Sequence, residues 1–82
     1  MENQNNKRVS IYSTPMCPYC EMAKDFFGEN NIEFTNYDVS TDVEKRKEMI
    51  EITGQMGVPV IVIDKQTIVG FNEDKLTKLL DL

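Results

Sequence analysis

The distribution of hydrophobic and polar residues predicts four short strands. Alternating apolar residues mark a first strand at Val9–Ser13 and a second at Ile32–Val39. The β-branched run Val60–Ile63 predicts a third strand that is covered on both faces. After a turn, Thr67–Val69 returns as a fourth strand and completes a hairpin with the third.

Apolar residues spaced three and four positions apart predict a helix after each of the first two strands and another at the end of the chain. Gly28 and Asn30–Asn31 are expected to end the first helix. The segment Thr41–Glu44 has capping-box spacing, so Thr41 is expected to cap the second helix. Asn72 is expected to cap the third. The first helix carries on one face the apolar residues that we expect in the core: Tyr19, Met22, Ala23, Phe26 and Phe27.

The order of these elements is β-α-β-α-β-β-α, which predicts an α/β fold with one mixed sheet. The first two strands and the helix between them form a parallel unit, and the hairpin adds antiparallel strands. The sheet therefore has four strands and is flanked by three helices. No repeat or linker divides the chain, so we expect a single domain at 8–82 after a disordered polar tail at 1–7.

Charge and composition exclude some classes of partner. The 82 residues carry a formal net charge of −5, which argues against nucleic acid or an anionic membrane as the partner. No apolar run approaches the roughly 20 residues that a membrane span requires. The segment Met1–Asn6 is polar and lacks the apolar core of a signal peptide. We therefore expect a cytoplasmic protein. We also expect a monomer.

The two cysteines of the chain lie in Cys17-Pro18-Tyr19-Cys20, between the first strand and the first helix. A cysteine at a helix start meets free N–H groups and the positive end of the helix dipole, and both favour the thiolate. Cys20 lies within one helical turn of Cys17, close enough to resolve a mixed disulfide. Pro18 falls near the first helical position, where its missing N–H costs nothing. The pattern indicates a dithiol redox centre.

Other uses of a Cys-x-x-Cys pair fit this chain less well. A structural zinc site needs four protein ligands, and the sequence has no histidine and no third cysteine. Carboxylates or a second chain would have to complete such a site, so we predict no metal site. A structural disulfide across so short a loop constrains the unfolded chain very little. Two buried, inert cysteines remain an alternative, although Pro18 and Tyr19 between them are not typical of core packing.

Four segments carry a resemblance to a known family: Ile11-Tyr12-Ser13, Cys17-Pro18-Tyr19-Cys20, Gly57-Val58-Pro59-Val60 and Ile68-Val69-Gly70-Phe71. By these segments the chain, from Val9 to Leu82, resembles the glutaredoxins of the dithiol CPYC type. The resemblance implies a thioredoxin-like fold and a thiol-disulfide oxidoreductase that reduces protein disulfides and glutathione mixed disulfides. It implies glutathione as co-substrate and reductant, disulfide-containing proteins as partners, and no tightly bound cofactor.

The resemblance also implies roles for individual residues. Cys17 would be the attacking thiol and Cys20 the resolving thiol. Pro59 would be the family's cis-proline, and the alternative is a proline that simply begins a strand. The backbone of Val58 would pair with the substrate peptide. The residues implied to bind substrate or glutathione are Tyr19, Val58, Pro59, Gly70, Phe71, Asn72 and Glu73.

The chain departs from the glutaredoxin pattern at this glutathione site. The family commonly has a lysine shortly before the first cysteine, where this chain has Ser13–Met16. Gly57 replaces the usual threonine, Val69–Gly70 replaces Gly-Gly, and Asn72–Glu73 replaces an acidic pair. Gly70 still allows close backbone approach, and the start of the last helix can take a carboxylate.

The departures leave alternatives open. They are similar to the glutaredoxin-like redoxins that serve ribonucleotide reductase, which take electrons from thioredoxin reductase and bind glutathione poorly. That group usually has other residues between its cysteines. A second alternative is a dimer that holds an iron–sulfur cluster through two Cys17 thiolates and two glutathiones, which the proline disfavours. A non-catalytic adaptor is a third, and some glutaredoxin-like proteins carry selenocysteine at the position of Cys17.

Overall fold

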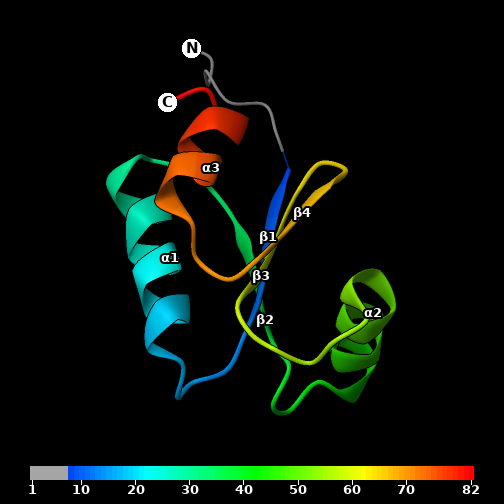
Figure 1. Ribbon diagram of the computed structural model, residues 1–82. Coiled ribbons are helices and arrows are strands. Elements are labelled where there is room, and N and C mark those ends of the chain that lie inside the picture. The colour runs from blue at the N-terminus through cyan, green and yellow to red at the C-terminus, as the bar shows by residue number, and fades with distance from the viewer. Residues whose placement is uncertain (1–7) are drawn as a thin grey trace.

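The computed structural model of the chain describes residues 8–82, so the tail predicted at 1–7 lies outside the described residues. Within these residues, strands and helices follow one another in the predicted order, as Figure 1 shows. The strands are β1 (Val9–Ser13), β2 (Thr35–Asp38), β3 (Val60–Ile63) and β4 (Gln66–Val69). The helices are α1 (Pro18–Glu29), α2 (Val43–Thr53) and α3 (Glu73–Leu79).

The strands form one mixed sheet in the order β2-β1-β3-β4. β1 and β2 are parallel, whereas β1–β3 and β3–β4 are antiparallel pairs, as predicted. In the register of the sheet, Val60 of β3 lies opposite both Tyr12 of β1 and Val69 of β4. The end of β1, the start of β3 and the end of β4 therefore meet at one end of the sheet, which we call the Val60 end.

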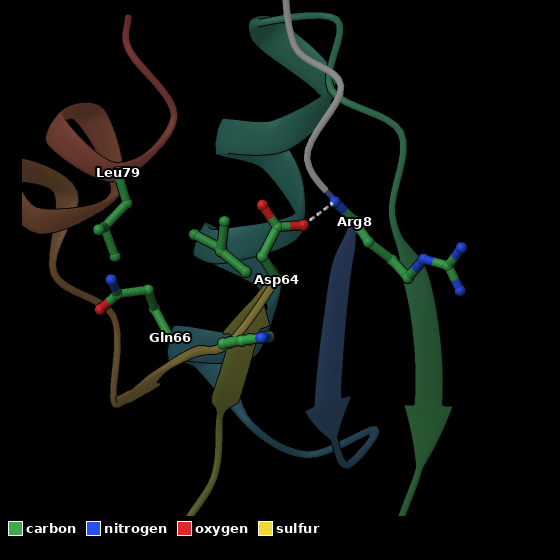
Figure 2. A pocket seen from close by; sticks show the side chains of 6 residues that line it. Arg8, Asp64, Gln66 and Leu79 are labelled. Atoms are coloured by element: carbon green, nitrogen blue, oxygen red, sulfur yellow. Dashed lines mark hydrogen bonds between the residues drawn. The ribbon is translucent and has the colours of Figure 1, made fainter.

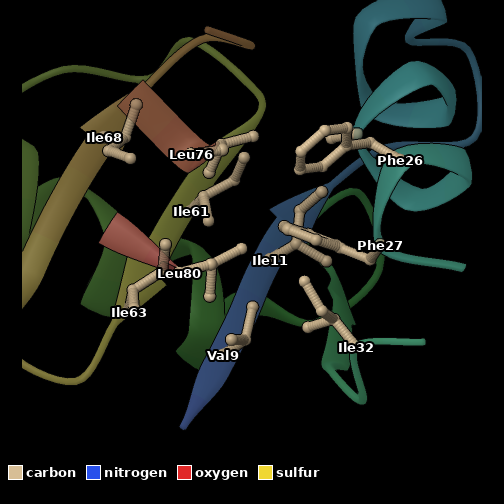
Figure 3. Close-up of a cluster of buried hydrophobic side chains, with 11 residues drawn as sticks. Val9, Ile11, Phe26, Phe27, Ile32, Ile61, Ile63, Ile68, Leu76 and Leu80 are labelled. Carbon is tan, nitrogen blue, oxygen red and sulfur yellow. The ribbon is translucent and has the colours of Figure 1, made fainter. Parts of the chain in front are cut away.

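Buried apolar side chains cover both faces of the sheet. The larger cluster lies against α1 and α3, and Figure 3 shows Ile11 of β1 beside Phe27 of α1. A smaller cluster, which includes Tyr12 and Val60, lies under α2 on the other face. Neighbouring residues of a strand point to opposite faces, so Val60 and Ile61 belong to different clusters. The prediction that β3 is covered on both faces is confirmed.

The predicted core face of α1 is wrong at the start of the helix. Tyr19 and Met22 expose 61% and 48% of their surface. The buried stripe begins instead at Cys20, which is fully buried, and this rotates the core face away from Tyr19 and Met22. The buried residues of the helix are Cys20, Ala23, Phe26 and Phe27.

The predicted end of α1 at Asn30–Asn31 is confirmed, with Asn30 as the C-cap, and the prediction is wrong only for Gly28. Gly28 lies inside the helix, and Asn31 adopts the left-handed conformation, with a φ of 57°. The Asn31 N–H donates to the Gly28 carbonyl at 3.2 Å. The Ile32 N–H donates to the Phe27 carbonyl at 2.8 Å, and the two bonds together form a Schellman motif. The backbone of Ile32 is therefore part of the helix end and not of the strand. The strand β2 covers only Thr35–Asp38.

The predicted cap of α2 is wrong by one residue. Asp42, not Thr41, is the N-cap, and its carboxylate accepts a hydrogen bond from the Lys45 N–H at 3.1 Å. Asp42 has the extended backbone that an N-cap requires. The prediction for α3 is confirmed, because the Asn72 side chain accepts a hydrogen bond from the Lys75 N–H at 3.1 Å.

Candidate active site

The two cysteines lie where β1 leads into α1, and their sulfurs form a disulfide bond. Cys17 is the N-cap of α1, and its sulfur accepts a hydrogen bond from the Cys20 N–H at 3.1 Å. The two Cα atoms are 5.2 Å apart, about the span of one helical turn. The Cys17 sulfur therefore faces the free N–H groups of the helix start, where a thiolate is stabilised.

A short turn carries the chain from β1 to Cys17. The Cys17 N–H donates to the Thr14 carbonyl at 3.4 Å, and this bond closes the turn. The Cys17 carbonyl then accepts a hydrogen bond from the Glu21 N–H at 3.2 Å. Pro18 occupies the start of the helix, as predicted, where no N–H needs a partner. Local backbone bonds thus fix Cys17 at the helix start.

The two cysteines differ in their access to solvent. Cys20 is fully buried, whereas Cys17 is half-buried. Beside them Met16 and Tyr19 expose 91% and 61% of their surface. A partner can therefore reach Cys17 but not Cys20, and the exposed Met16 and Tyr19 are close to Cys17 in the sequence.

The Val58–Pro59 peptide bond is cis, as predicted. It directly precedes β3 at the Val60 end of the sheet, the end at which β1 leads to Cys17. Pro59 is fully buried, and its carbonyl accepts a hydrogen bond from the Gly70 N–H at 2.8 Å. Gly70 has a φ of 88°, which glycine adopts without strain. The structure thus brings together two segments for which the resemblance implies substrate binding.

The remaining predicted binding residues follow Gly70. Phe71 is half-buried, and its ring centroid lies 6.0 Å from that of Phe26 on α1. Asn72 uses its side-chain oxygen to cap α3, which leaves its amide –NH₂ for a ligand. Glu73 is exposed in the first turn of α3. A groove between α1 and this segment is lined by Met22, Asp25, Phe26, Glu29, Phe71 and Glu73.

The loop before the cis bond contains a residue that the sequence analysis missed. The Gln55 side-chain oxygen accepts a hydrogen bond from the Gly57 N–H at 2.6 Å, and its amide nitrogen donates to the Gly57 carbonyl at 3.3 Å. The Gln55 N–H in turn donates to the Thr53 hydroxyl at 3.3 Å. The sequence does contain a signal for this role. Backbone groups of a loop need hydrogen-bond partners, and Gln55 has a long amide side chain between Gly54 and Gly57.

A hydrogen-bonded cluster on the α2 face supports the strand that leads to Cys17. The Tyr12 hydroxyl donates to Glu48 Oε1 at 2.7 Å, and Lys45 Nζ donates to the same oxygen at 3.2 Å. Burial, followed by the hydrogen bond to Glu48, raises the pKa of Tyr12. The hydrogen bond from Tyr12, followed by that from Lys45, lowers the pKa of Glu48. The cluster ties β1 to α2.

Another hollow lies at the opposite end of the sheet, where β1 begins and β3 ends (Figure 2). The Arg8 N–H donates to Asp64 Oδ1 at 2.9 Å, and the Asp64 N–H donates back to the Arg8 carbonyl at 2.9 Å. None of the residues that the sequence assigned to the active site lines this hollow. The residues that line it are Arg8, Ile63, Asp64, Lys65, Gln66 and Leu79.

Residues 8–82 contain neither a cluster of metal-ligating side chains nor a membrane-spanning helix. Within residues 8–82, no three side chains of His, Cys, Asp or Glu come together in a group that could hold a metal ion. The sequence has no histidine at any position. No helix among the described residues combines the length and the apolarity needed to cross a membrane.

The known proteins that this chain resembles in sequence and in structure include glutaredoxins and glutaredoxin-like proteins. The family model for glutaredoxin matches residues 9–68. The uncharacterized glutaredoxin-like 8.6 kDa protein of the Clostridium pasteurianum rubredoxin operon is 44% identical over 73 residues, which cover 89% of this chain and 97% of that protein. Glutaredoxin 3 of Escherichia coli K12 is 37% identical over 65 residues, covering 79% of this chain and 78% of that protein. The crystal structure of a glutaredoxin from Archaeoglobus fulgidus matches with a TM-score of 0.81 and 25% identity, over 96% of this chain and 95% of that one. With its thioredoxin-like fold and its Cys17–Cys20 pair, the chain belongs to the glutaredoxin family.

Proposed function

We propose that this thiol-disulfide oxidoreductase takes its electrons from glutathione and reduces protein disulfides and glutathione mixed disulfides in a reducing cytoplasm. One observation carries the proposal, namely the difference between the two cysteines. Cys17 is half-buried at the start of α1, whereas Cys20 is fully buried behind it. This arrangement suits Cys17 to attack a substrate and Cys20 to resolve the product.

The reaction starts from the reduced pair. The Cys17 thiolate attacks one sulfur of the substrate disulfide, forms a mixed disulfide with it and releases the other sulfur as a thiolate, which takes up a proton. With a protein disulfide, Cys20 then loses its proton and attacks the Cys17 sulfur. This step releases the second substrate thiol and leaves the Cys17–Cys20 disulfide, the state seen in the structure. Two molecules of glutathione reduce this disulfide and become glutathione disulfide.

A glutathione mixed disulfide needs only Cys17. The thiolate takes over the glutathionyl group and releases the substrate thiol. A second glutathione then attacks the glutathionyl sulfur, leaves as glutathione disulfide and restores the Cys17 thiolate. The Cys20 N–H, 3.1 Å from the Cys17 sulfur, is a donor that can stabilise this leaving thiolate.

The proposed glutathione site consists of Tyr19, Val58, Pro59 and residues 70–73. Three observations support it. Tyr19 exposes 61% of its surface beside the cysteines. The Gly70 N–H donates a hydrogen bond to the Pro59 carbonyl, so the segment after β4 lies beside the cis peptide bond. A side chain built at Gly70 would meet open space, so a ligand can approach the backbone there.

A second candidate function rests on the departures from the family pattern. Gly57, Val69 and the lysine-free segment Ser13–Met16 are similar to the redoxins that receive electrons from thioredoxin reductase and serve ribonucleotide reductase. Val69 exposes 53% of its surface at the end of β4, where the glutaredoxin pattern has a glycine. An apolar side chain at this position favours contact with a protein over contact with a small peptide.

Turnover with a glutathione mixed disulfide distinguishes the two functions. The protein is coupled once to glutathione with glutathione reductase and once to thioredoxin reductase alone. We expect NADPH consumption with the glutathione system that depends on the concentration of this protein. Activity with thioredoxin reductase and none with the glutathione system would overturn the proposed use of glutathione and would support the second candidate. The Cys17→Ser variant is the control for both assays.

A further inference from the structure

We propose that Gln55 is a positioning residue that sets where a substrate backbone can pair with the active site. Its side chain makes two hydrogen bonds to Gly57, which we call the Gln55 clamp. The clamp occupies both the backbone N–H and the backbone carbonyl of Gly57. The clamp leaves Val58 as the pairing position beside the cis bond. The inference rests on the proposed function, because it concerns how a peptide disulfide is held while Cys17 attacks it.

The hydrogen bonds made by the backbone groups of residues 57–59 support the assignment. The Gly57 N–H and carbonyl are both bonded to Gln55. Pro59 has no N–H, and its carbonyl accepts the Gly70 N–H at 2.8 Å. Within residues 8–82, neither the N–H nor the carbonyl of Val58 has a hydrogen-bond partner. Among residues 57–59, Val58 is therefore the residue that can exchange both bonds with an extended chain, as paired residues do in an antiparallel sheet.

The clamp is anchored to α2 and the core. Thr53 is the last residue of α2, and its hydroxyl oxygen accepts a hydrogen bond from the Gln55 N–H. The same hydroxyl donates a hydrogen bond to the Met49 carbonyl at 2.8 Å. Met49 is buried in the cluster under α2, and the Val58 side chain packs against the same cluster. Both ends of the loop are thus fixed, and Gln55 holds the residues between them. A loop held in this way loses less freedom when a substrate pairs with it.

Glycine at position 57 makes the clamp possible. A Cβ built at Gly57 would lie 2.6 Å from the Gln55 side-chain oxygen, closer than real contacts allow. Any larger residue at position 57 therefore displaces the Gln55 amide. That amide is the far end of a flexible side chain, so it can rotate away at little cost to folding. Substitution of Gln55 and substitution of Gly57 are thus two independent ways to remove the same hydrogen bonds.

The test compares two disulfides in single-turnover reactions with the fully reduced protein, which makes it independent of the electron donor. One substrate is the disulfide dimer of a blocked Gly-Cys-Gly peptide, which has backbone groups beside its sulfur. The other is dithiobis(nitrobenzoate), which has none. For Gln55→Ala we expect a rate with the peptide about threefold to tenfold below that of the wild type, with an unchanged rate on the aromatic disulfide.

Gly57→Ala should show the same selective loss, and the double variant should be no slower than either single variant. The matched control is Gln66→Ala, which removes an exposed glutamine at the start of β4, far from the Val60 end. It should leave both rates unchanged. Hydrogen exchange of the Gly57 amide reports on the clamp itself and should be faster in Gln55→Ala.

The outcomes separate this inference from the proposed function. If the wild type reduces both disulfides but Gln55→Ala slows both equally, or neither, the positioning role is wrong and the proposed function stands. A further loss when Gly57→Ala is added to Gln55→Ala would also overturn it, because the clamp is already absent. If the wild type reduces neither disulfide, the proposed function fails and takes this inference with it.

Discussion

The backbone N–H of Cys20 lies 3.1 Å from the sulfur of Cys17, so the buried cysteine donates a hydrogen bond to the half-buried one. This N–H belongs to the first turn of α1, and the helix fixes its direction. Cys20 therefore has two separable parts, a backbone donor that acts on Cys17 and a thiol that can attack it. A substitution that removes only the thiol leaves the donor in place.

Substitution of each cysteine should therefore give a different result. Cys17→Ser should abolish reduction of every disulfide, because a hydroxyl is a far weaker nucleophile than a thiolate at neutral pH. Cys20→Ser should retain most of the activity on glutathione mixed disulfides and lose the activity on protein disulfides that needs two thiols. Both activities can be measured by coupled NADPH oxidation. Equal loss of the two activities in Cys20→Ser would contradict this division of roles.

Tyr19 should contribute to glutathione binding and not to folding. It exposes 61% of its surface, so Tyr19→Ala should change the free energy of unfolding by less than about 0.5 kcal/mol. Loss of the ring should lower kcat/KM for glutathione by about twofold to tenfold, the range expected for one aromatic contact. Tyr19→Phe is the matched control and should stay near the wild-type value if the ring face makes the contact. Wild-type kcat/KM in Tyr19→Ala would exclude Tyr19 from the site.

The bond between Tyr12 and Glu48 should make stability depend on pH. The Tyr12 hydroxyl, and then Lys45, lower the pKa of Glu48, so this stabilisation is complete above the ordinary glutamate pKa and is lost as the pH falls through the lowered value. The pKa of Tyr12 is raised, chiefly by burial, so its contribution is complete below the ordinary tyrosine pKa and is lost as the pH rises above it.

Tyr12→Phe tests this dependence. Because Glu48 is exposed to solvent, we expect the variant to lose only about 0.5–1 kcal/mol near neutral pH, and less in acid, where Glu48 is protonated. Urea unfolding at both pH values measures the difference. Tyr37→Phe is the control, since its ring packs against Tyr12 and its hydroxyl makes no hydrogen bond within residues 8–82. A loss in Tyr12→Phe that is the same at both pH values would contradict the prediction.

The cap of α2 can be tested by a pair of substitutions at neighbouring positions. Asp42→Ala removes the acceptor of the Lys45 N–H and should cost about 1 kcal/mol of unfolding free energy. Thr41→Ala should cost clearly less, because Thr41 is exposed and lies outside the helix. The midpoints of thermal unfolding rank the two variants. A larger loss in Thr41→Ala would favour the cap that the sequence predicted.

Periodicity predicted the elements of this fold well and their ends less well. The β-branched run at Val60–Ile63 has no polar residue to face solvent, so its burial on both faces followed from composition. The cap of α2 could not be chosen in this way, because Thr41 and Asp42 are both good capping residues and only the backbone conformation decides between them. The start of β2 was missed because the Schellman motif uses Ile32, an apolar residue that also fits a strand.

The candidate active site shows the same limit. The strand pattern before the two cysteines and the helix pattern after them were sufficient to predict Cys17 at a helix start. Tyr19 and Met22 were assigned to the core because helical spacing cannot show which side of a helix faces the sheet, and the burial of Cys20 decides that. Gln55 was missed because its role depends on hydrogen bonds to the Gly57 backbone, which a pattern of residue types does not reveal.

The hollow in Figure 2 has a practical consequence for experiments on this protein. Lys65 is exposed in the turn between β3 and β4, at the end of the sheet opposite the Val60 end. Exposed turns with polar residues tolerate added groups. A fluorophore or a surface linker attached at Lys65 would therefore leave Cys17, Val58 and Gly70 uncovered, and the protein could work as an immobilised sensor of disulfide exchange.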